Sequence, residues 1–139
     1  MKRVLLVDDD MAVLSALQRA LRSMFGSAVT VDALRDPLLA LAQAQRCRYD
    51  VVLSDLRMPD LDGLAFLTLM AAVQPQAVRV MLTGSADFET AQRAINDAGV
   101  FRYLCKPWDE HTLRCHLEAA LHQAEINQSE AASNKPVHA

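Results

Sequence analysis

Polar side chains with the potential for phosphoryl or metal chemistry follow four short apolar runs of this sequence. The residues at these places are Asp8, Asp9 and Asp10, then Asp55, then Thr83 and Gly84, and finally Lys106 and Pro107. Carboxylate oxygens with remaining waters suit Mg²⁺, which usually takes one or two carboxylates from a protein. An ammonium group and a hydroxyl group stabilise charge on a transferred phosphoryl group. These residue types together predict phosphoryl transfer onto a carboxylate beside a divalent cation.

Each candidate residue is assigned a role from its chemistry. Asp55 is the nucleophile, because a carboxylate is already ionised near neutral pH and needs no separate base. Asp8 and Asp9 hold the metal, since clustered carboxylates raise one another's pKa and oppose folding unless cations offset them. Thr83 supplies the hydroxyl donor and Lys106 the counter-ion. This chemistry leaves the choice between Asp55 and Asp8 as nucleophile open.

Short apolar runs alternate with stretches of helical period along the chain, which predicts a series of strand–helix units. The strands are expected at residues 3–7, 28–33, 51–54, 78–82 and 101–105. Their continuous apolar character is typical of parallel strands that are covered on both faces. We therefore expect an open α/β sheet with helices on both faces and a ligand site beyond the carboxyl ends of the strands.

Apolar side chains between these strands recur at steps of three and four, which predicts amphipathic helices. The stripes are Leu14, Leu17, Leu21 and Met24, then Phe88, Ala91, Ile95 and Ala98, and then Leu113, Leu117 and Leu121. Helix starts are expected at the capping residues Asp10, Asp36 before Pro37, Asp87 and Asp109, and helix ends at Gly26 and Gly99. Each stripe needs a sheet face to bury it.

Length and composition restrict the class of protein. A chain of 139 residues with a net charge of −3 is long enough for one domain and lacks the basic field typical of nucleic-acid binding. The apolar runs are too short for a signal peptide or a membrane span, so a cytoplasmic location is expected. Cys47, Cys105 and Cys115 lack a CxxC spacing, so neither a disulfide framework nor a zinc site is expected. The polar end of the sequence predicts a domain over residues 1–126 and a flexible tail over residues 127–139.

Four sequence blocks resemble the signature blocks of the receiver domain of bacterial two-component response regulators. They are LLVDDD, VLSDLRMPDLDGL, VMLTG and YLCKPW, and the resemblance covers residues 3 to about 124 in the family's order. It implies a flavodoxin-like doubly wound (βα)5 sheet with strand order 2-1-3-4-5. The run LTGSADFETAQRAINDAGVFRYLCKPWD further resembles receivers that are attached to metal-dependent phosphohydrolase or AAA+ output domains.

The resemblance implies a role for each site residue. Asp55 is the phosphoacceptor, and Asp8 and Asp9 hold Mg²⁺ or Mn²⁺ together with Asp55 and the backbone carbonyl of Arg57. Lys106 is the lysine of the site, and Pro107 follows it after an expected cis bond. The phosphodonor implied by the family is a histidine kinase or a phosphotransfer protein. No separate enzymatic activity is implied beyond self-phosphorylation and self-dephosphorylation.

The resemblance also implies a switch. Thr83 and Tyr103 are its matching residues, and they change the surface of the fourth helix, fifth strand and fifth helix to control a partner or output domain. The same surface allows a homodimer. Arg57 and Gly84 depart from the commonest family pattern at positions that tune phosphoryl lifetime, and Trp108 replaces a frequent phenylalanine.

Other functions fit the sequence less well. Asp8 and Asp10 partly match the first motif of a phosphatase of the haloacid dehalogenase type. The second acidic pair and the cap domain of such a phosphatase are missing from this sequence. A flavin carrier on the same fold is opposed by carboxylates at the end of the first strand, which repel a flavin phosphate. A degenerate receiver is opposed by the intact site residues. The chain also fits the receiver portion of a longer regulator with a phosphohydrolase or transcriptional output.

Overall fold

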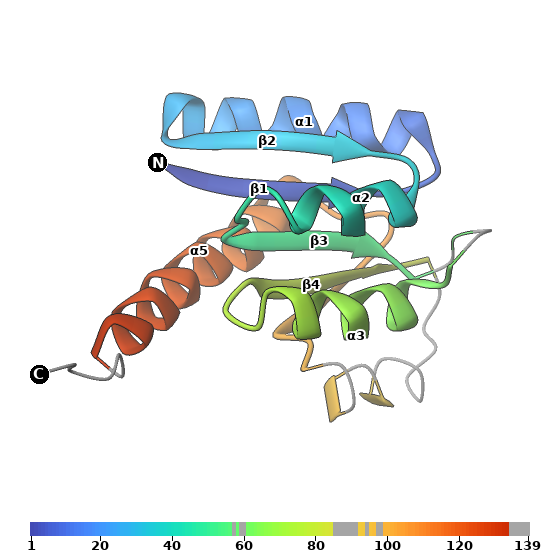
Figure 1. Ribbon diagram of the computed structural model, residues 1–139. Helices are drawn as coiled ribbons and strands as arrows, with labels where there is room; N and C mark the ends of the chain where they lie inside the picture. The colour runs from blue at the N-terminus through green and yellow to red at the C-terminus, as the bar shows by residue number, and fades with distance from the viewer. Residues whose placement is uncertain (57, 59–60, 85–91, 94, 97–98, 134–139) are drawn as a thin grey trace, which may run out of the picture.

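The computed structural model describes the chain except for residues 57, 59–60, 85–91, 94, 97–98 and 134–139. A central sheet has α1 and α5 on one face and α2 and α3 on the other (Figure 1). The elements are β1 (Lys2–Val7), α1 (Met11–Phe25), a 3-10 turn (Gly26–Ala28), β2 (Val29–Leu34), α2 (Pro37–Ala44), β3 (Val51–Asp55), α3 (Gly63–Val73), β4 (Val78–Thr83), β5 (Arg102–Cys105) and α5 (Glu110–Ser133). The predicted strands are confirmed with shifts of one residue at some ends.

The sheet is parallel, and its strand order is β2-β1-β3-β4-β5. This order confirms the predicted flavodoxin-like arrangement, in which β1 and β3 lie side by side at the centre. Asp8 follows β1 directly and Asp55 is the last residue of β3, so both lie at the edge where strand order reverses along the chain. Ligand sites of open α/β sheets lie at this position.

Strand β1 shows why the central strands are apolar at every position. Leu5 and Val7 belong to the core beneath α2 and α3, whereas Val4 and Leu6 belong to the core beneath α1 and α5. Successive side chains of a strand point to opposite faces, so a strand covered on both sides needs apolar residues throughout. Full burial of each such side chain contributes about 1.5–3 kcal/mol to stability.

Aspartate caps start the helices, as the sequence predicted for three of them. The backbone N–H groups of Ala12, Leu38 and Thr112 donate to the carboxylates of Asp10, Asp36 and Asp109 over 2.9, 2.9 and 2.7 Å. A further cap was not predicted: Ala65 donates to Asp62 at the start of α3. Gly26, which follows α1, and Gly99 have positive φ values of 55° and 63°, which glycine tolerates. The helix end predicted at Gly99 falls beside residues outside the described ranges. Asp87 and most of the stripe from Phe88 to Ala98 lie outside the described residues.

Helix α5 continues to Ser133, past the point where the sequence predicted a flexible tail. The polar side chains of this extension bind the amino-terminal edge of the sheet. Asn127 donates to the carbonyl oxygen of Gln76 over 3.0 Å, and Gln128 donates to Asp50 over 2.7 Å. These tertiary hydrogen bonds explain why residues 127–133 are helical despite their composition. The division of the chain into domain and tail at residue 126 stays a prediction.

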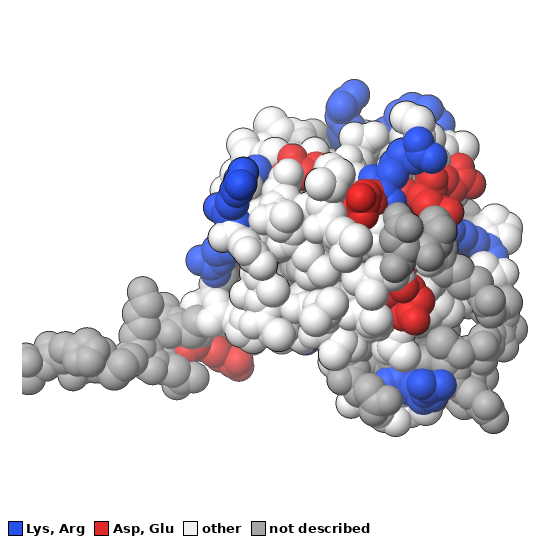
Figure 2. All heavy atoms as spheres, turned by 45° about the vertical axis from the view of Figure 1, so that its right-hand side comes forward, with Lys and Arg blue, Asp and Glu red and all other residues white. Residues whose placement is uncertain are grey.

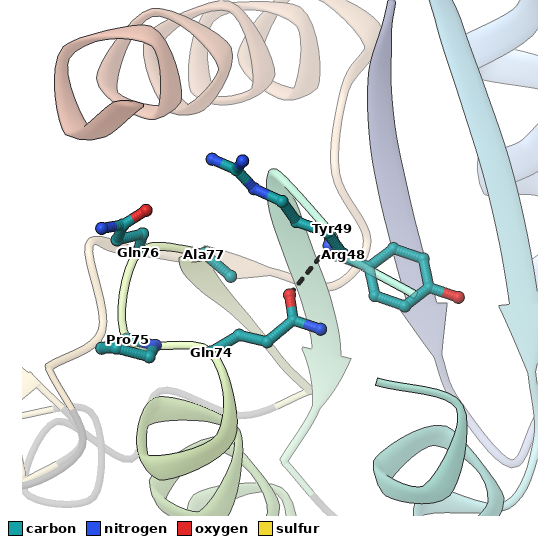
Figure 3. Close-up of a pocket in the computed structure, with 6 residues that line it drawn as sticks. All are labelled: Arg48, Tyr49, Gln74, Pro75, Gln76 and Ala77. Carbon is teal, nitrogen blue, oxygen red and sulfur yellow. Dashed lines mark hydrogen bonds between the residues drawn. The ribbon is translucent and has the colours of Figure 1, made fainter. Parts of the chain in front are cut away.

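A cavity of about 340 Å³ lies at the same amino-terminal edge of the sheet, and Gln74 forms part of its wall (Figure 3). The Gln74 amide joins three backbone groups. Its oxygen accepts from the N–H of Tyr49 over 2.8 Å, and its nitrogen donates to the carbonyl oxygens of Ala44 and Cys47 over 2.5 and 2.6 Å. Gln74 therefore fixes the loop that leads from α2 into β3.

Replacing Gln74 by methionine is expected to lower the free energy of unfolding by about 2 kcal/mol, because partly buried backbone groups lose their partners. Chemical denaturation monitored by circular dichroism measures this loss. Gln76→Met is the matched control, since Gln76 lines the same cavity with an exposed side chain. Equal unfolding midpoints for the two variants would contradict the role of the Gln74 amide.

Candidate functional site

The register of the sheet brings the predicted site residues to one edge. Val7 pairs with Ser54, so Asp8 and Asp55 follow on neighbouring strands. Thr83 pairs with Cys105, the residue before Lys106. With the strand ends turned toward the viewer, Figure 2 shows acidic side chains gathered close to basic ones on this side of the molecule. The sheet thus places carboxylate, hydroxyl and ammonium groups together from segments far apart in the sequence.

The ammonium group of Lys106 joins two buried carboxylates. Its Nζ lies 3.0 Å from Oδ2 of Asp8 and 3.2 Å from Oδ1 of Asp55. The other oxygen of Asp8, Oδ1, accepts from the backbone N–H of Asp10 over 2.9 Å. Asp8 is 1% exposed, whereas the Asp55 side chain retains 11%. The carboxylate of Asp55 is therefore the more accessible of the two.

Burial and charge shift the pKa values of this group. Burial raises the pKa of Asp8 above its ordinary value, and the nearby Asp55 charge adds to the rise, although Asp10 and Lys106 act in the opposite direction. Burial alone lowers the pKa of Lys106. The hydrogen bond from Lys106 to Asp8 and the charges of Asp55 and Asp8 outweigh that effect, so the pKa of Lys106 is raised. The lysine is fully charged near neutral pH and offsets the buried carboxylates.

Asp9 adds a third carboxylate to the site. One oxygen from each of Asp8, Asp9 and Asp55 lies within 4.8 Å of the other two. Such a cluster of carboxylate oxygens has the donor chemistry that a hard divalent cation prefers. Asp10 instead uses its side chain to cap α1, as predicted. Arg57, whose carbonyl is the remaining predicted ligand, lies outside the described residues.

Comparison with known proteins identifies the family. Residues 4–118 match the response regulator receiver domain. The chain belongs to this family. It is a receiver domain of two-component response regulators, which act as phosphorylation-controlled switches and are not enzymes in the usual sense. Membership of this family implies a histidine kinase as the phosphodonor and an output domain as a partner.

Named relatives are transcriptional regulators. The receiver domain is 36% identical over 105 residues to the hydrogenase transcriptional regulatory protein HoxA of Cupriavidus necator, covering 76% of this chain and 21% of that protein. It is 35% identical over 132 residues to the DNA-binding transcriptional regulator NtrC of Proteus hauseri. This match covers 94% of this chain and 27% of that protein. The chain therefore spans about a quarter of the length of these relatives.

Solved structures confirm the receiver fold. The signal receiver domain of an HD domain-containing protein from Pseudomonas fluorescens superposes with a TM-score of 0.85 at 31% sequence identity, covering 92% of each chain. Within the described ranges of the present chain, every helix is too short or too polar to cross a lipid bilayer.

The predicted switch residues of the receiver domain occupy different settings. Thr83 is 3% exposed at the end of β4. Tyr103 is half-buried and packs against the apolar core beneath α2 and α3. It also lines a groove of about 570 Å³ with Ile95, Phe101, Arg102 and His116. Thr83 directly follows the β4 residue that pairs with Asp55, and Tyr103 lies in β5. Their role as a switch stays a prediction.

The segments around the lysine agree with the sequence predictions. The peptide bond between Lys106 and Pro107 is cis. Trp108 packs against the apolar core beneath α1 and α5, so its side chain contributes to packing. A Cβ atom on Gly84 meets no atom of the described residues within 4 Å. These residues therefore leave room at this position, where the family more often has alanine.

Gly63 supports the site in a way that sequence analysis missed. Its N–H donates to the carbonyl oxygen of Leu56 over 2.7 Å. A Cβ atom at Gly63 would overlap the Asp55 carbonyl oxygen and come within 2.7 Å of the Leu56 Cα. Glycine is required because α3 starts against the backbone at the end of β3. A glycine directly after the capping aspartate Asp62 was the available sequence signal.

Arg35 is a second supporting residue that the sequence did not single out. Its Nε donates to the carbonyl oxygen of Asp9 over 3.2 Å, from the segment that follows β2. This contact ties the loop after β1 to the neighbouring strand. Since the interaction uses a backbone oxygen of Asp9, no residue pattern in the sequence reveals it.

Proposed function

We propose that this receiver domain accepts a phosphoryl group on Asp55 from a histidine kinase or a phosphotransfer protein. The observation that carries the proposal is the Lys106 ammonium group, which lies within 3.2 Å of both Asp8 and Asp55. A cation at this place neutralises charge on a phosphoryl group bonded to the adjacent carboxylate. The 11% exposure of the Asp55 side chain supports its assignment as acceptor. In Asp8, hydrogen bonds to Lys106 and to the Asp10 N–H occupy both oxygens.

Asp8, Asp9 and Asp55 are proposed to hold Mg²⁺ or Mn²⁺, together with the carbonyl oxygen of Arg57. Their oxygens lie within 4.8 Å of one another and are hard donors, which supports this assignment. The bound cation supplies neutralisation of charge on the phosphoryl oxygens. Asp8 also contacts Lys106 over 3.0 Å, which helps to keep the ammonium group beside Asp55.

The chemical step requires little from the protein beyond positioning and charge. An Asp55 oxygen attacks phosphorus, the bond from phosphorus to the donor nitrogen breaks, and the electron pair of that bond leaves with the donor. Lys106 donates hydrogen bonds to a phosphoryl oxygen, and Thr83 donates its hydroxyl hydrogen to another. No base is needed, because the pKa of an ordinary carboxyl group lies well below neutral pH.

The output is proposed to be a change of surface. Phosphorylation favours the conformation in which Thr83 moves toward the new oxygens and Tyr103 moves inward, which is a two-state population shift. The surface affected is that of the fourth helix, β5 and α5, and the fourth helix expected from the sequence lies largely outside the described residues. This surface controls a partner or an attached output domain and allows a homodimer. Direct binding of nucleic acid or membrane by this domain, and a location outside the cytoplasm, are not expected.

Mass spectrometry of the intact protein tests the acceptor. After incubation with acetyl phosphate and Mg²⁺, the wild-type protein is expected to gain the mass of one phosphoryl group, and Asp55→Asn is expected to gain none. Asp10→Asn is the matched control, because asparagine also caps a helix and Asp10 lies outside the carboxylate cluster. A phosphoryl gain in Asp55→Asn equal to that of the wild type would assign the acceptor elsewhere.

Magnesium is expected to raise the melting temperature of the wild-type domain, because it binds the native carboxylate cluster and stabilises by about 2.7 kcal/mol at a concentration of 100 Kd. Differential scanning fluorimetry with and without Mg²⁺ measures this shift. The double variant Asp9→Ala, Asp55→Asn removes two of the three carboxylates and is expected to lose most of the shift. An equal shift in wild type and double variant would contradict the metal site, whereas Asp10→Asn should keep the full shift.

A further inference from the structure

Two side chains on α5 form a pair outside the carboxylate cluster. His111 Nε2 lies 3.6 Å from Cys115 Sγ, and both residues are exposed. They are four positions apart, so they lie one turn from each other on the same face of the helix. The buried side of α5 carries Leu113, Leu117, Ala120 and Ala124. The His111–Cys115 pair thus lies on the side of α5 turned away from the sheet.

The distance within this pair fits a sulfur–nitrogen hydrogen bond and equally fits two ligands on one metal ion. Zinc binds imidazole nitrogen at about 2.0–2.1 Å and thiolate sulfur at about 2.3 Å, so a tetrahedral angle places these two atoms about 3.6 Å apart. The separation of His111 Nε2 and Cys115 Sγ equals this value without any movement of the helix. The helix backbone fixes the spacing of the two Cα atoms, so binding has to order only the two side chains.

We propose that His111 and Cys115 form a surface binding site for Zn²⁺ or a similar borderline-soft divalent cation. His111 binds as neutral imidazole through Nε2, and Cys115 binds as thiolate through Sγ. The thiol proton is released to solvent when the sulfur–metal bond forms, and water completes the coordination. Nitrogen and sulfur donors favour Zn²⁺, whereas the carboxylate cluster at the strand ends favours Mg²⁺, so the two sites differ in metal preference.

The side chains beyond the pair are compatible with a cation. Glu118 and His122 continue the same face of α5 at steps of three and four, and both belong to residue types that bind metals. Glu118 also lies 4.0 Å from Arg114 in an exposed ion pair, which is weak enough for a metal ion to replace. The sequence prediction of no zinc site considered the spacing of the cysteines alone. A histidine followed four residues later by a cysteine is visible only when the two residue types are considered together on a helix.

Cobalt binding tests the site, because a thiolate ligand gives Co²⁺ a charge-transfer absorption that carboxylate ligands do not give. The full chain is titrated with Co²⁺ in the presence of excess Mg²⁺, which occupies the carboxylate cluster. The wild type is expected to develop the thiolate band, and Zn²⁺ is expected to abolish it by displacement. Cys115→Ser should lack the band, and His111→Gln should raise the Kd at least tenfold.

Cys105→Ser is the matched control, since Cys105 is also exposed but lies in β5 without a described histidine partner. It is expected to keep the band and the Kd of the wild type. Because His111 and Cys115 are exposed, their variants should unfold at the wild-type temperature without metal. A wild type without the thiolate band, or a band that persists in Cys115→Ser, would overturn the proposal and leave the pair as an ordinary hydrogen bond.

Discussion

Lys106→Met is expected to lower the rate of phosphoryl transfer onto Asp55 by a factor of about 10²–10³ at saturating Mg²⁺, the usual effect of losing one group that stabilises developing charge. The Lys106 Nζ lies 3.2 Å from Oδ1 of Asp55, and methionine keeps the length of the side chain without its charge. Rates of mass gain with acetyl phosphate measure the effect. The phosphorylated fraction at long times tests whether Asp55 remains the acceptor.

The same variant is expected to lose about 3 kcal/mol of stability at neutral pH. This value is near the lower end for a broken buried ion pair, because the lysine side chain is 22% exposed.

The loss of stability is expected to depend on pH through Asp8. Burial raises the pKa of Asp8, so its protonated carboxyl group stabilises the folded state at low pH, and this stabilisation is lost as the pH rises through the pKa of the folded state. Without Lys106 the pKa of Asp8 rises further. The stability difference between wild type and variant should therefore shrink as pH falls and Asp8 becomes protonated.

Urea denaturation at neutral pH and at a pH below the ordinary carboxyl pKa measures this dependence. Arg114→Met is the control, because the contact of Arg114 with Glu118 over 4.0 Å is an exposed ion pair of small energetic value. A loss of stability in Lys106→Met that is the same at both pH values would show that the effect arises from packing and not from the carboxylates.

Sequence reasoning predicted the sheet and its reactive edge because both follow from local patterns. The doubly covered strands are apolar at every position, as β1 shows, and parallel pairing aligns the polar residues that follow them. The caps Asp10, Asp36 and Asp109 are recognised from a few neighbouring residues. Strand order itself came from the resemblance to receiver domains, since spacing alone does not specify which strands are neighbours.

What the sequence did not reveal depends on contacts between distant segments. The helical extension of α5 is held by Asn127 and Gln128 through Gln76 and Asp50, which are far apart in the chain. The accessibility of Asp55 relative to Asp8 depends on hydrogen bonds formed only in the folded state. The separation of His111 and Cys115 likewise depends on side-chain rotamers. Composition of a segment cannot encode such partners.

Gly63→Ala is expected to lower the free energy of unfolding by about 3 kcal/mol, the upper part of the range for overpacking. A Cβ atom at Gly63 meets the backbone of Asp55 and Leu56, and neither can rotate away as a side chain does. Either α3 or the end of β3 must shift. Since β3 carries Asp55, the proposed acceptor, the variant is also expected to accept phosphoryl groups more slowly even under conditions where it is folded.

Gly84→Ala separates this steric effect from a general cost of adding a methyl group near the site. A Cβ atom at Gly84 meets no described residue within 4 Å, so the variant should equal the wild type in stability or exceed it by about 0.4–1 kcal/mol through a less flexible unfolded chain. The free energy of unfolding and the phosphorylation rate of both variants, measured under the same conditions, show whether the overlap at Gly63 causes the effect. If Gly63→Ala were as stable as Gly84→Ala, the start of α3 would be free to move, and the acceptor strand would not depend on Gly63 for its position.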